Sequence, residues 1–155
     1  MKKLAALIVT LTLLSCGPKV VRDSKKVIKG SWNLTTISYS QSGTYNVTLL
    51  NDTSKQCFEG SSWQFIPNNN TGIYTINNGD CPTGERNFIF TIQEVDVQTG
   101  LYDFLLKPTD AKGKSETNKG FRLKLTSLSD TNMQWQQTVL LEGEPFTISM
   151  NFTKA

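Results

Sequence analysis

The residues of this chain that could do chemistry are few. Histidine is absent from all 155 residues, which removes the commonest general base, the commonest metal ligand and every Ser-His or Cys-His pair. Several carboxylates are expected at turns and strand ends, but their spacing does not hold any two of them at the separation that a glycosidase needs. They are Glu59, Asp80, Glu85, Glu94 and Asp103. We therefore predict a protein that is not an enzyme and that uses no cofactor.

Cys57 and Cys81 form the second group of reactive side chains. They flank two short apolar runs, Trp63–Ile66 and Ile73–Ile76, which are separated by the turn formers of Pro67–Gly72 and are typical of a β-hairpin. Neither cysteine has an adjacent base, and two cysteines without histidine do not make a zinc site. In an exported chain we expect a Cys57–Cys81 disulfide rather than two free thiols, and it would contribute about 3–4 kcal/mol of stability.

The third cysteine, Cys16, ends an N-terminal leader. Met1–Lys3 gives a positive start, and the apolar run Leu4–Leu14 is typical of a secretory signal because it is too short to span a bilayer permanently. The ending Leu13-Leu14-Ser15-Cys16 resembles the lipobox of bacterial lipoproteins. This resemblance implies cleavage after residue 15 and a lipid anchor on the Cys16 sulfur, with a plain secretory signal as the alternative. Gly17 is not a signal for retention in the inner membrane, so the outer membrane of the cell envelope is favoured.

The charge balance argues against a nucleic-acid partner. The formal net charge of +3 includes Lys2 and Lys3 of the leader, and the other basic residues nearly balance the 13 acidic ones. Lys25, Lys26 and Lys29 form a small basic cluster, which we interpret as part of a solvated linker. The sequence therefore predicts a signal peptide over residues 1–15, a lipidated cysteine and flexible tether over 16–29, and one globular domain over 30–155.

Short segments rich in β-branched and aromatic residues recur along this domain, punctuated by turn signals. In the first, Trp32, Leu34 and Thr36 are expected to share a face. Residues 43–58 predict a short helix or an ordered loop with Val47, Leu49 and Leu50 packed on the core, and 107–119 predicts an exposed loop. The predicted strands are 31–39, 63–66, 73–76, 87–95, 101–106, 121–126, 133–139 and 146–152.

These eight segments are joined by connections short enough for antiparallel neighbours. An all-β, eight-stranded antiparallel up-and-down β-barrel follows, whose interior is either filled by side chains or holds one small ligand. A sandwich of two sheets is the alternative. The local connections favour the barrel.

Gly30-Ser31-Trp32 at the start of the first strand resembles the Gly-X-Trp signature of lipocalins, in which the tryptophan plugs the closed end of the barrel. The resemblance is more specific when this tripeptide is combined with the lipobox, the segments 57–63 and 68–74, and Cys81. In this combination the chain is similar to the lipocalin-like lipoproteins common in Bacteroidetes. The resemblance implies a calycin-type barrel. It also implies an arginine over Trp32, which would be Arg86 or Arg122.

The inward faces of the predicted strands could line a cavity for one small apolar or amphipathic molecule. Gln137, in phase with Trp135, is either a polar ligand anchor or a residue at the rim. The alternative is that these side chains fill the barrel, and that a structural module binds a protein or glycan through its loops. We expect a monomer. The predicted ligand-binding residues are Tyr74, Phe90, Tyr102, Phe104, Leu123, Trp135, Gln137, Ile148 and Met150.

Overall fold

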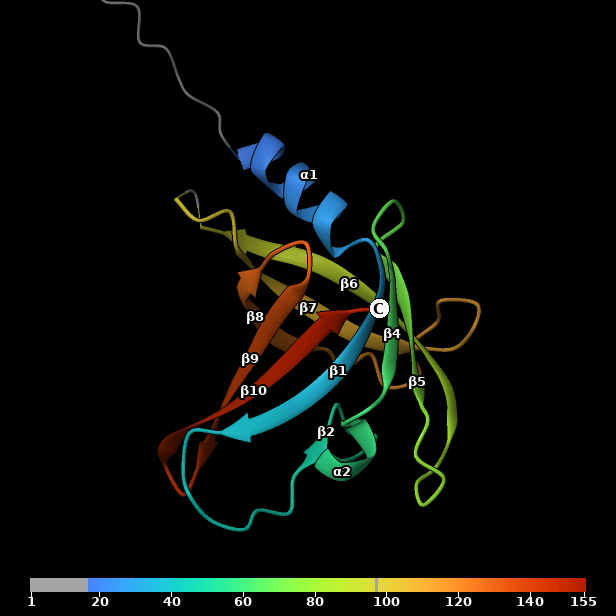
Figure 1. Ribbon diagram of the computed structural model, residues 1–155, viewed down its shortest axis with the longest axis vertical. Coiled ribbons are helices and arrows are strands. Elements are labelled where there is room, and N and C mark those ends of the chain that lie inside the picture. The colour runs from blue at the N-terminus through green and yellow to red at the C-terminus, as the bar shows by residue number, and fades with distance from the viewer. Residues whose placement is uncertain (1–16, 97) are drawn as a thin grey trace, which may run out of the picture.

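The computed structural model describes residues 17–96 and 98–155 and contains one closed antiparallel β-barrel (Figure 1). Each strand pairs with its neighbour along the chain, and pairing of the first strand with both the last strand and β4 closes the ring. The predicted eight-stranded up-and-down barrel is confirmed, and the sandwich alternative is wrong. The barrel strands are β1 (Gly30–Tyr39), β4 (Ser62–Ile66), β5 (Thr71–Ile76), β6 (Gly84–Val95), β7 (Tyr102–Thr109), β8 (Phe121–Leu128), β9 (Asn132–Leu141) and β10 (Glu144–Lys154).

Alternation of buried and less buried residues holds along most of the strands, and a bulge interrupts it in β1. The register of β1 against β10 shifts between Leu34 and Thr36. The extra residue moves Thr36 to the exposed face and Ile37 to the buried one, so the prediction that Thr36 shares a face with Trp32 and Leu34 is wrong. Strand β7 also runs to Thr109, which makes the exposed loop after it shorter than predicted.

The segment expected to be a flexible tether is helical over α1 (Gly17–Ile28). Ile28 is only 1% exposed, and the Ser24 hydroxyl donates to the carbonyl of Gly100 at 3.0 Å. The Lys25 ammonium donates to the side-chain oxygen of Asn70 at 2.8 Å. These contacts dock α1 on one end of the barrel, which we call the helix end (Figure 1). Residues 1–16, including the predicted signal peptide and Cys16, and Val97 lie outside the described residues.

Trp32 closes the helix end. Its side chain is fully buried, and its indole N–H donates to the carbonyl of Ile28 at 2.8 Å. The Lys154 Nζ lies 4.3 Å from the centroid of the Trp32 ring and donates to the carbonyls of Val27 and Lys29. Burial lowers the pKa of Lys154, and Asp130 partly opposes this shift. The cation over the tryptophan is therefore a lysine from the last strand.

The two arginines considered for that position lie elsewhere. Arg86 pairs with Asp52 at 3.0 Å, and Arg122 pairs with Asp103 at 3.1 Å. The expectation that either would cover Trp32 is wrong, because their strands place both of them in these other ion pairs.

Residues 48–58, the lid segment, cover the opposite end, the lid end (Figure 1). The segment consists of β2 (Thr48–Leu49), β3 (Thr53–Ser54) and the short helix α2 (Lys55–Phe58). Leu49, Leu50 and Phe58 are buried, which confirms the expected packing of this region on the core. The predicted Cys57–Cys81 disulfide is also confirmed, with a Cα–Cα distance of 5.7 Å, and it ties α2 to the turn between β5 and β6.

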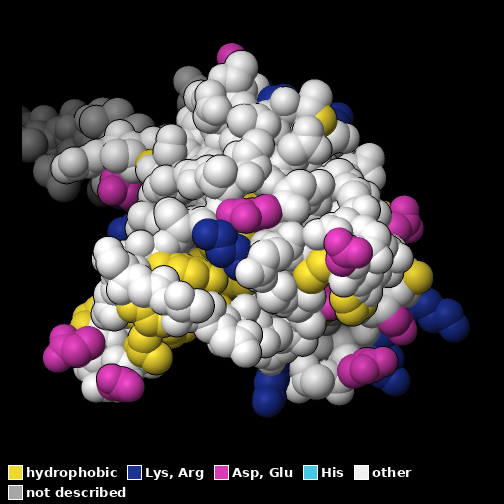
Figure 2. All heavy atoms as spheres, turned by 60° about the horizontal axis from the view of Figure 1, so that its bottom comes forward, with side chains coloured by type: hydrophobic (Ala, Val, Ile, Leu, Met, Phe, Trp, Pro, Cys, Tyr) yellow, Lys and Arg dark blue, Asp and Glu magenta, His cyan; other side chains and the backbone are white. Residues whose placement is uncertain are grey.

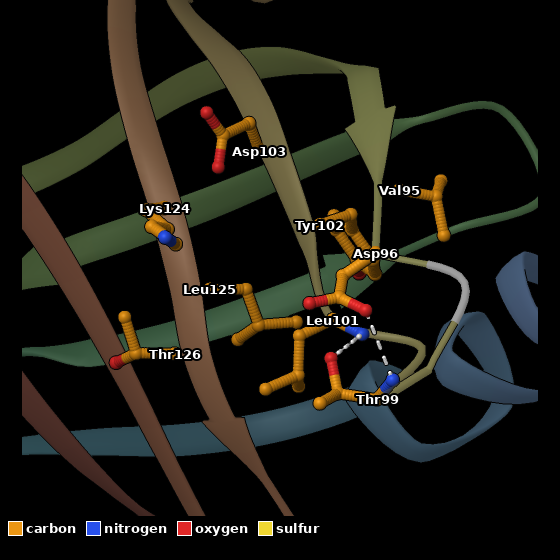
Figure 3. A pocket seen from close by; sticks show the side chains of 9 residues that line it. All are labelled: Val95, Asp96, Thr99, Leu101, Tyr102, Asp103, Lys124, Leu125 and Thr126. Carbon is orange, nitrogen blue, oxygen red and sulfur yellow. Dashed lines mark hydrogen bonds between the residues drawn. The ribbon is translucent and has the colours of Figure 1, made fainter.

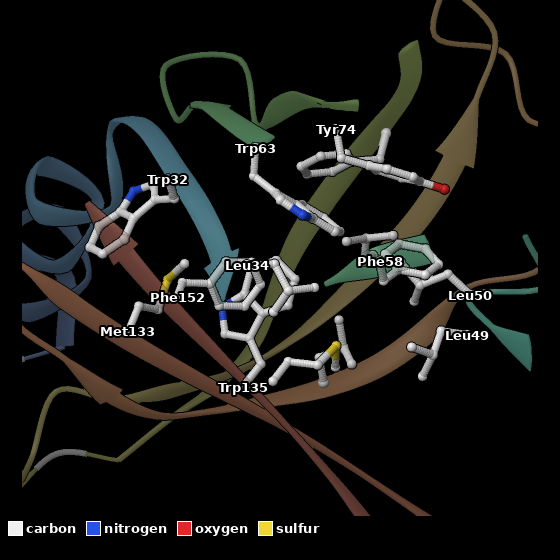
Figure 4. Packing of buried hydrophobic residues seen from close by; sticks show 14 of the residues in the cluster. Trp32, Leu34, Leu49, Leu50, Phe58, Trp63, Tyr74, Met133, Trp135 and Phe152 are labelled. Atoms are coloured by element: carbon white, nitrogen blue, oxygen red, sulfur yellow. The ribbon is translucent and has the colours of Figure 1, made fainter. Parts of the chain in front are cut away.

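Aromatic rings fill the centre of the barrel (Figure 4). Trp63 stacks on Tyr74 with ring centroids 4.6 Å apart and meets Trp135 edge-on at 5.3 Å. Trp135 in turn contacts Phe152 at 4.5 Å and Phe104 at 5.0 Å. All five rings are buried, so they form a packed core that links opposite walls of the barrel.

Candidate functional site

The predicted ligand-binding residues lie within this packed core. The eight that are not glutamine are all buried and belong to one cluster: Tyr74, Phe90, Tyr102, Phe104, Leu123, Trp135, Ile148 and Met150. Gln137 is only partly buried and pairs with Ile148 where β9 approaches its exposed hairpin. The structure therefore brings the eight side chains together. That they contact a ligand stays a prediction.

The wall of the barrel has a short seam between β7 and β8. The two strands pair only where Asp103–Leu106 meets Phe121–Lys124. Strand β8 continues to Leu128, although β7 begins at Tyr102, so the last residues of β8 have no β7 residue beside them. The turn between β6 and β7 lies opposite this unpaired end of β8 (Figure 3).

A cavity of about 560 Å³ opens at this place, and we call it the slit. Leu101 and Leu125 lie close together in it, one from the turn and one from β8 (Figure 3). Tyr102 and Leu125 are buried side chains of the barrel interior, whereas Lys124 is an exposed side chain of the outer face. The slit thus reaches residues on both faces of the wall. Its lining comprises Val95, Asp96, Thr99, Leu101, Tyr102, Asp103, Lys124, Leu125 and Thr126.

Tyr102 gives the slit a polar group at its inner side. The side chain is 2% exposed, and its hydroxyl has no hydrogen-bond partner among the described residues. Burial raises the pKa of Tyr102, so the group stays a neutral donor in the physiological range. A buried hydroxyl without a partner costs about 1–3 kcal/mol, and an entering hydrogen-bond acceptor would remove that cost.

A second orphaned donor lies deeper in the same core. The indole N–H of Trp135 also has no partner among residues 17–96 and 98–155. The Phe104 ring contacts both side chains, with its centroid 6.1 Å from that of Tyr102 and 5.0 Å from that of Trp135. The core behind the slit therefore holds two donors and offers neither an acceptor.

Asp96 shapes the outer rim of the slit. Its carboxylate accepts hydrogen bonds from the backbone N–H groups of Gln98 at 2.8 Å and Thr99 at 3.1 Å. These bonds lower the pKa of Asp96, the bond from Gln98 contributing most. The Leu101 N–H donates to the Thr99 hydroxyl at 3.3 Å, which fixes the turn further (Figure 3). The rim thus presents a fixed carboxylate in a cavity that Lys124 also lines.

A smaller cavity of about 330 Å³ lies at the lid end. Leu50, Pro108 and Phe121 form its apolar part, and residues of the loop after β7 form its polar part. Leu50 lines this cavity and is also, like Leu49, a buried member of the core cluster. Asp52, in the turn between β2 and β3 that also contains Leu50, ties this turn to the barrel wall. Its carboxylate accepts hydrogen bonds from the Tyr74 hydroxyl at 2.9 Å and from the Arg86 side chain at 3.0 Å. The lid end is therefore closed more firmly than the slit.

Two of the five carboxylates considered for catalysis make structural contacts. Glu59 accepts from the backbone N–H of Ile37 at 2.7 Å, and Asp103 pairs with Arg122. Within the described part of the chain, no group of three or more Cys, Asp or Glu side chains could hold a metal ion. Neither described helix has the length and apolar character needed to cross a membrane.

Of the residues that line the slit, only Tyr102 is among the ligand-binding residues predicted from the sequence. The slit depends on the stagger between β7 and β8, which alternation alone does not reveal. One local signal was available. Asp96 followed by Thr99-Gly100 is typical of a turn built by side-chain acceptors, and it marks the rim but not the opening.

No family model and no curated protein matches the sequence of this chain. Among solved structures, it is similar to a lipocalin-like protein from Bacteroides uniformis, with a TM-score of 0.50 and 11% identity over 83% of this chain and 99% of the other. It is also similar to bovine odorant binding protein in complex with a selenium-containing odorant, with a TM-score of 0.44 and 14% identity over 84% of this chain and 72% of the other. The first of these similarities, with the closed barrel and its plugged helix end, shows that this chain has the lipocalin-like, calycin-type fold.

Proposed function

We propose that this chain is a lipid-anchored, monomeric and non-catalytic protein of the bacterial cell envelope that binds one small amphipathic molecule in the slit. The observation that carries the proposal is the position of Tyr102, an interior residue with an unpartnered hydroxyl that also lines an open cavity. A cavity of about 560 Å³ lies within the size range of small-molecule sites.

The lining defines the class of ligand. Val95, Leu101 and Leu125 offer apolar contact, and Tyr102 offers a donor at the inner side. A fitting molecule has an apolar body and an acceptor such as a carbonyl or ether oxygen. The filled core leaves the deeper aromatic residues as support for this site, and a ligand would reach them only by displacing side chains.

Two measurements test ligand binding. Native mass spectrometry of the protein purified from its own host should find a co-purified amphiphile. In addition, Leu101→Trp should fill the slit and weaken binding of a fluorescent amphipathic probe by about tenfold, which is on the order of 1.4 kcal/mol. Leu140→Trp, on the exposed β9–β10 hairpin, is the matched control and should leave the affinity unchanged. Equal losses in both variants would count against the slit.

The anchor has its own test. We infer from the lipobox that Cys16 carries the lipid and that the outer membrane is the destination. Cys16→Ala should move the protein from the membrane fraction to the soluble fraction. Continued membrane association of this variant would refute anchoring through that thiol.

A second candidate function rests on the β9–β10 hairpin. Val139, Leu140 and Leu141 are exposed hydrophobic residues at its end, and Leu140 is 76% exposed. On the side where Figure 1 places this hairpin, Figure 2 shows hydrophobic side chains gathered together with acidic ones at their margin. Such a surface is typical of contact with another protein. Loss of a cross-linked partner in Leu140→Ser cells, with probe binding retained, would favour this alternative.

A further inference from the structure

Helix α1 forms one wall of a cationic groove that neither the fold nor the slit explains. The other wall is the turn between β4 and β5, and the groove has a volume of about 400 Å³. Four of its six lining residues are cations. The lining consists of Arg22, Lys25, Lys26, Lys29, Pro67 and Asn68.

The geometry of the groove is fixed by docking of the helix. Lys25 bridges the two walls, because its ammonium donates to the side-chain oxygen of Asn70 in the β4–β5 turn at 2.8 Å. The burial of Ile28 and the bond from Ser24 to Gly100 hold the other faces of α1. The cluster is therefore presented on a folded surface and is not a solvated linker.

The charge of this groove is only partly compensated. The Asp23 Oδ1 atom lies 3.4 Å from the Lys26 Nζ atom, and Asp23 is the one acidic residue within α1. Holding four cations around one hollow costs Coulomb energy, which an anion in the groove would offset. Ammonium and guanidinium groups are the donors that proteins commonly use for phosphate oxygens.

We propose that this groove binds the anionic phosphate of a membrane lipid headgroup. Position in the chain favours a lipid over free phosphate, because α1 begins at Gly17, directly after the cysteine proposed to carry the anchor. At 1.5 Å per residue, Arg22, Lys25 and Lys26 lie within roughly 15 Å of Gly17 along the helix axis, so a lipid anchor on the preceding residue would hold them close to the headgroup layer. This step rests on the proposed lipid anchor, whereas the anion site itself does not.

Soluble short-chain lipids test the groove without a bilayer. The mature protein, purified from host membranes in a non-ionic detergent, is titrated by NMR with dihexanoyl phosphatidylglycerol, dihexanoyl phosphatidylcholine and inorganic phosphate. We expect the phosphatidylglycerol affinity to exceed the phosphatidylcholine affinity by about tenfold and to fall as salt is raised, because ions screen exposed charges.

A matched pair of variants assigns the effect to the groove. Lys25→Gln with Lys26→Gln and Lys29→Gln should lower the phosphatidylglycerol affinity by about tenfold. Lys112→Gln with Lys114→Gln and Lys119→Gln removes the same charge from the exposed loop after β7 and should change it less than about twofold. Unfolding midpoints of both variants check that α1 stays docked.

Three outcomes would overturn the proposal. They are equal affinity for the two lipids, equal losses in the two triple variants, or inorganic phosphate binding as tightly as phosphatidylglycerol in the same groove. The last result would assign the groove to free phosphate. None of them depends on the fate of Cys16→Ala, so failure of this inference and failure of the lipid anchor are distinguishable.

Discussion

The two ends of this barrel are closed by different means. At the lid end, a disulfide, an Asp52–Tyr74–Arg86 cluster and three buried apolar side chains act together. At the helix end, Trp32 is held by one hydrogen bond and one lysine, and the β7–β8 seam beside it is open. The difference teaches that the disulfide and the slit lie at opposite ends of the barrel. The proposed binding therefore predicts that a ligand enters beside the helix.

The largest expected effect concerns Trp32. Trp32→Ala should lower the free energy of unfolding by about 3–5 kcal/mol, because it removes a fully buried ring and its hydrogen bond to Ile28. Urea unfolding measures the change, and Leu140→Ala, at an exposed position, should cost less than about 0.5 kcal/mol. A loss below about 1 kcal/mol for Trp32→Ala would mean that the helix end is not closed by this ring.

The disulfide should matter for stability and not for binding. Because the disulfide closes the chain between Cys57 and Cys81, its reduction should lower the free energy of unfolding by about 3–4 kcal/mol. Probe affinity at the slit should stay within about twofold, since the slit is at the other end of the barrel. An unchanged unfolding midpoint under reductant would contradict the first expectation, and a large loss of affinity would contradict the separation of the two ends.

Alkaline pH should destabilise the protein through one buried tyrosine near each end. Burial raises the pKa of Tyr74, with Asp52 adding to the shift, and burial alone raises that of Tyr102. The unfolded chain loses these protons near pH 10 while the folded chain retains them, so stability present below pH 10 is lost above it. Each tyrosine should account for about 1 kcal/mol between pH 10 and 11.

Urea unfolding at the two pH values measures this loss. Tyr74→Phe and Tyr102→Phe should each remove their own share. A pH dependence that persists unchanged in both variants would show that neither tyrosine is the source.

The smallest effect has the most specific sign. Tyr102→Phe should raise the free energy of unfolding of the ligand-free protein by about 1 kcal/mol at pH 7, because it removes a buried hydroxyl without a partner. The same change should weaken ligand binding by about fivefold to tenfold through loss of the donor. Tyr74→Phe is the control. The Tyr74 hydroxyl donates a hydrogen bond to Asp52, so its removal should lower the free energy of unfolding. A destabilised Tyr102→Phe would show that the hydroxyl has a partner.

Much of the fold could be predicted from the sequence, because it rests on local patterns. Alternation of residues such as Phe146, Ile148, Met150 and Phe152 identified the inward faces, and the hairpin flanked by Cys57 and Cys81 gave the disulfide. Features that depend on register were not accessible in this way. The bulge at Leu34 and Thr36 and the stagger of β7 against β8 arise when strands pair around the whole ring.

Contacts between distant segments were likewise beyond the sequence patterns. Lys154 reaches Trp32 only because β1 and β10 are neighbours in the closed barrel. The polar composition of residues 17–28 suggested a linker. Contacts of α1 with Gly100, Asn70 and Trp32 stabilise a helix there instead, and these contacts arise only from tertiary packing.

Photolabelling tests the location of the site most directly. A diazirine-bearing alkyl carboxylate or ketone is irradiated with the full mature protein, and labelled peptides are mapped by mass spectrometry. Binding in the slit predicts labels within residues 95–103 and 124–126, and their loss in Leu101→Trp. Labels confined to residues 48–58 and 108–121, at the lid end, would contradict the proposal, as would labelling that an excess of unlabelled probe does not reduce.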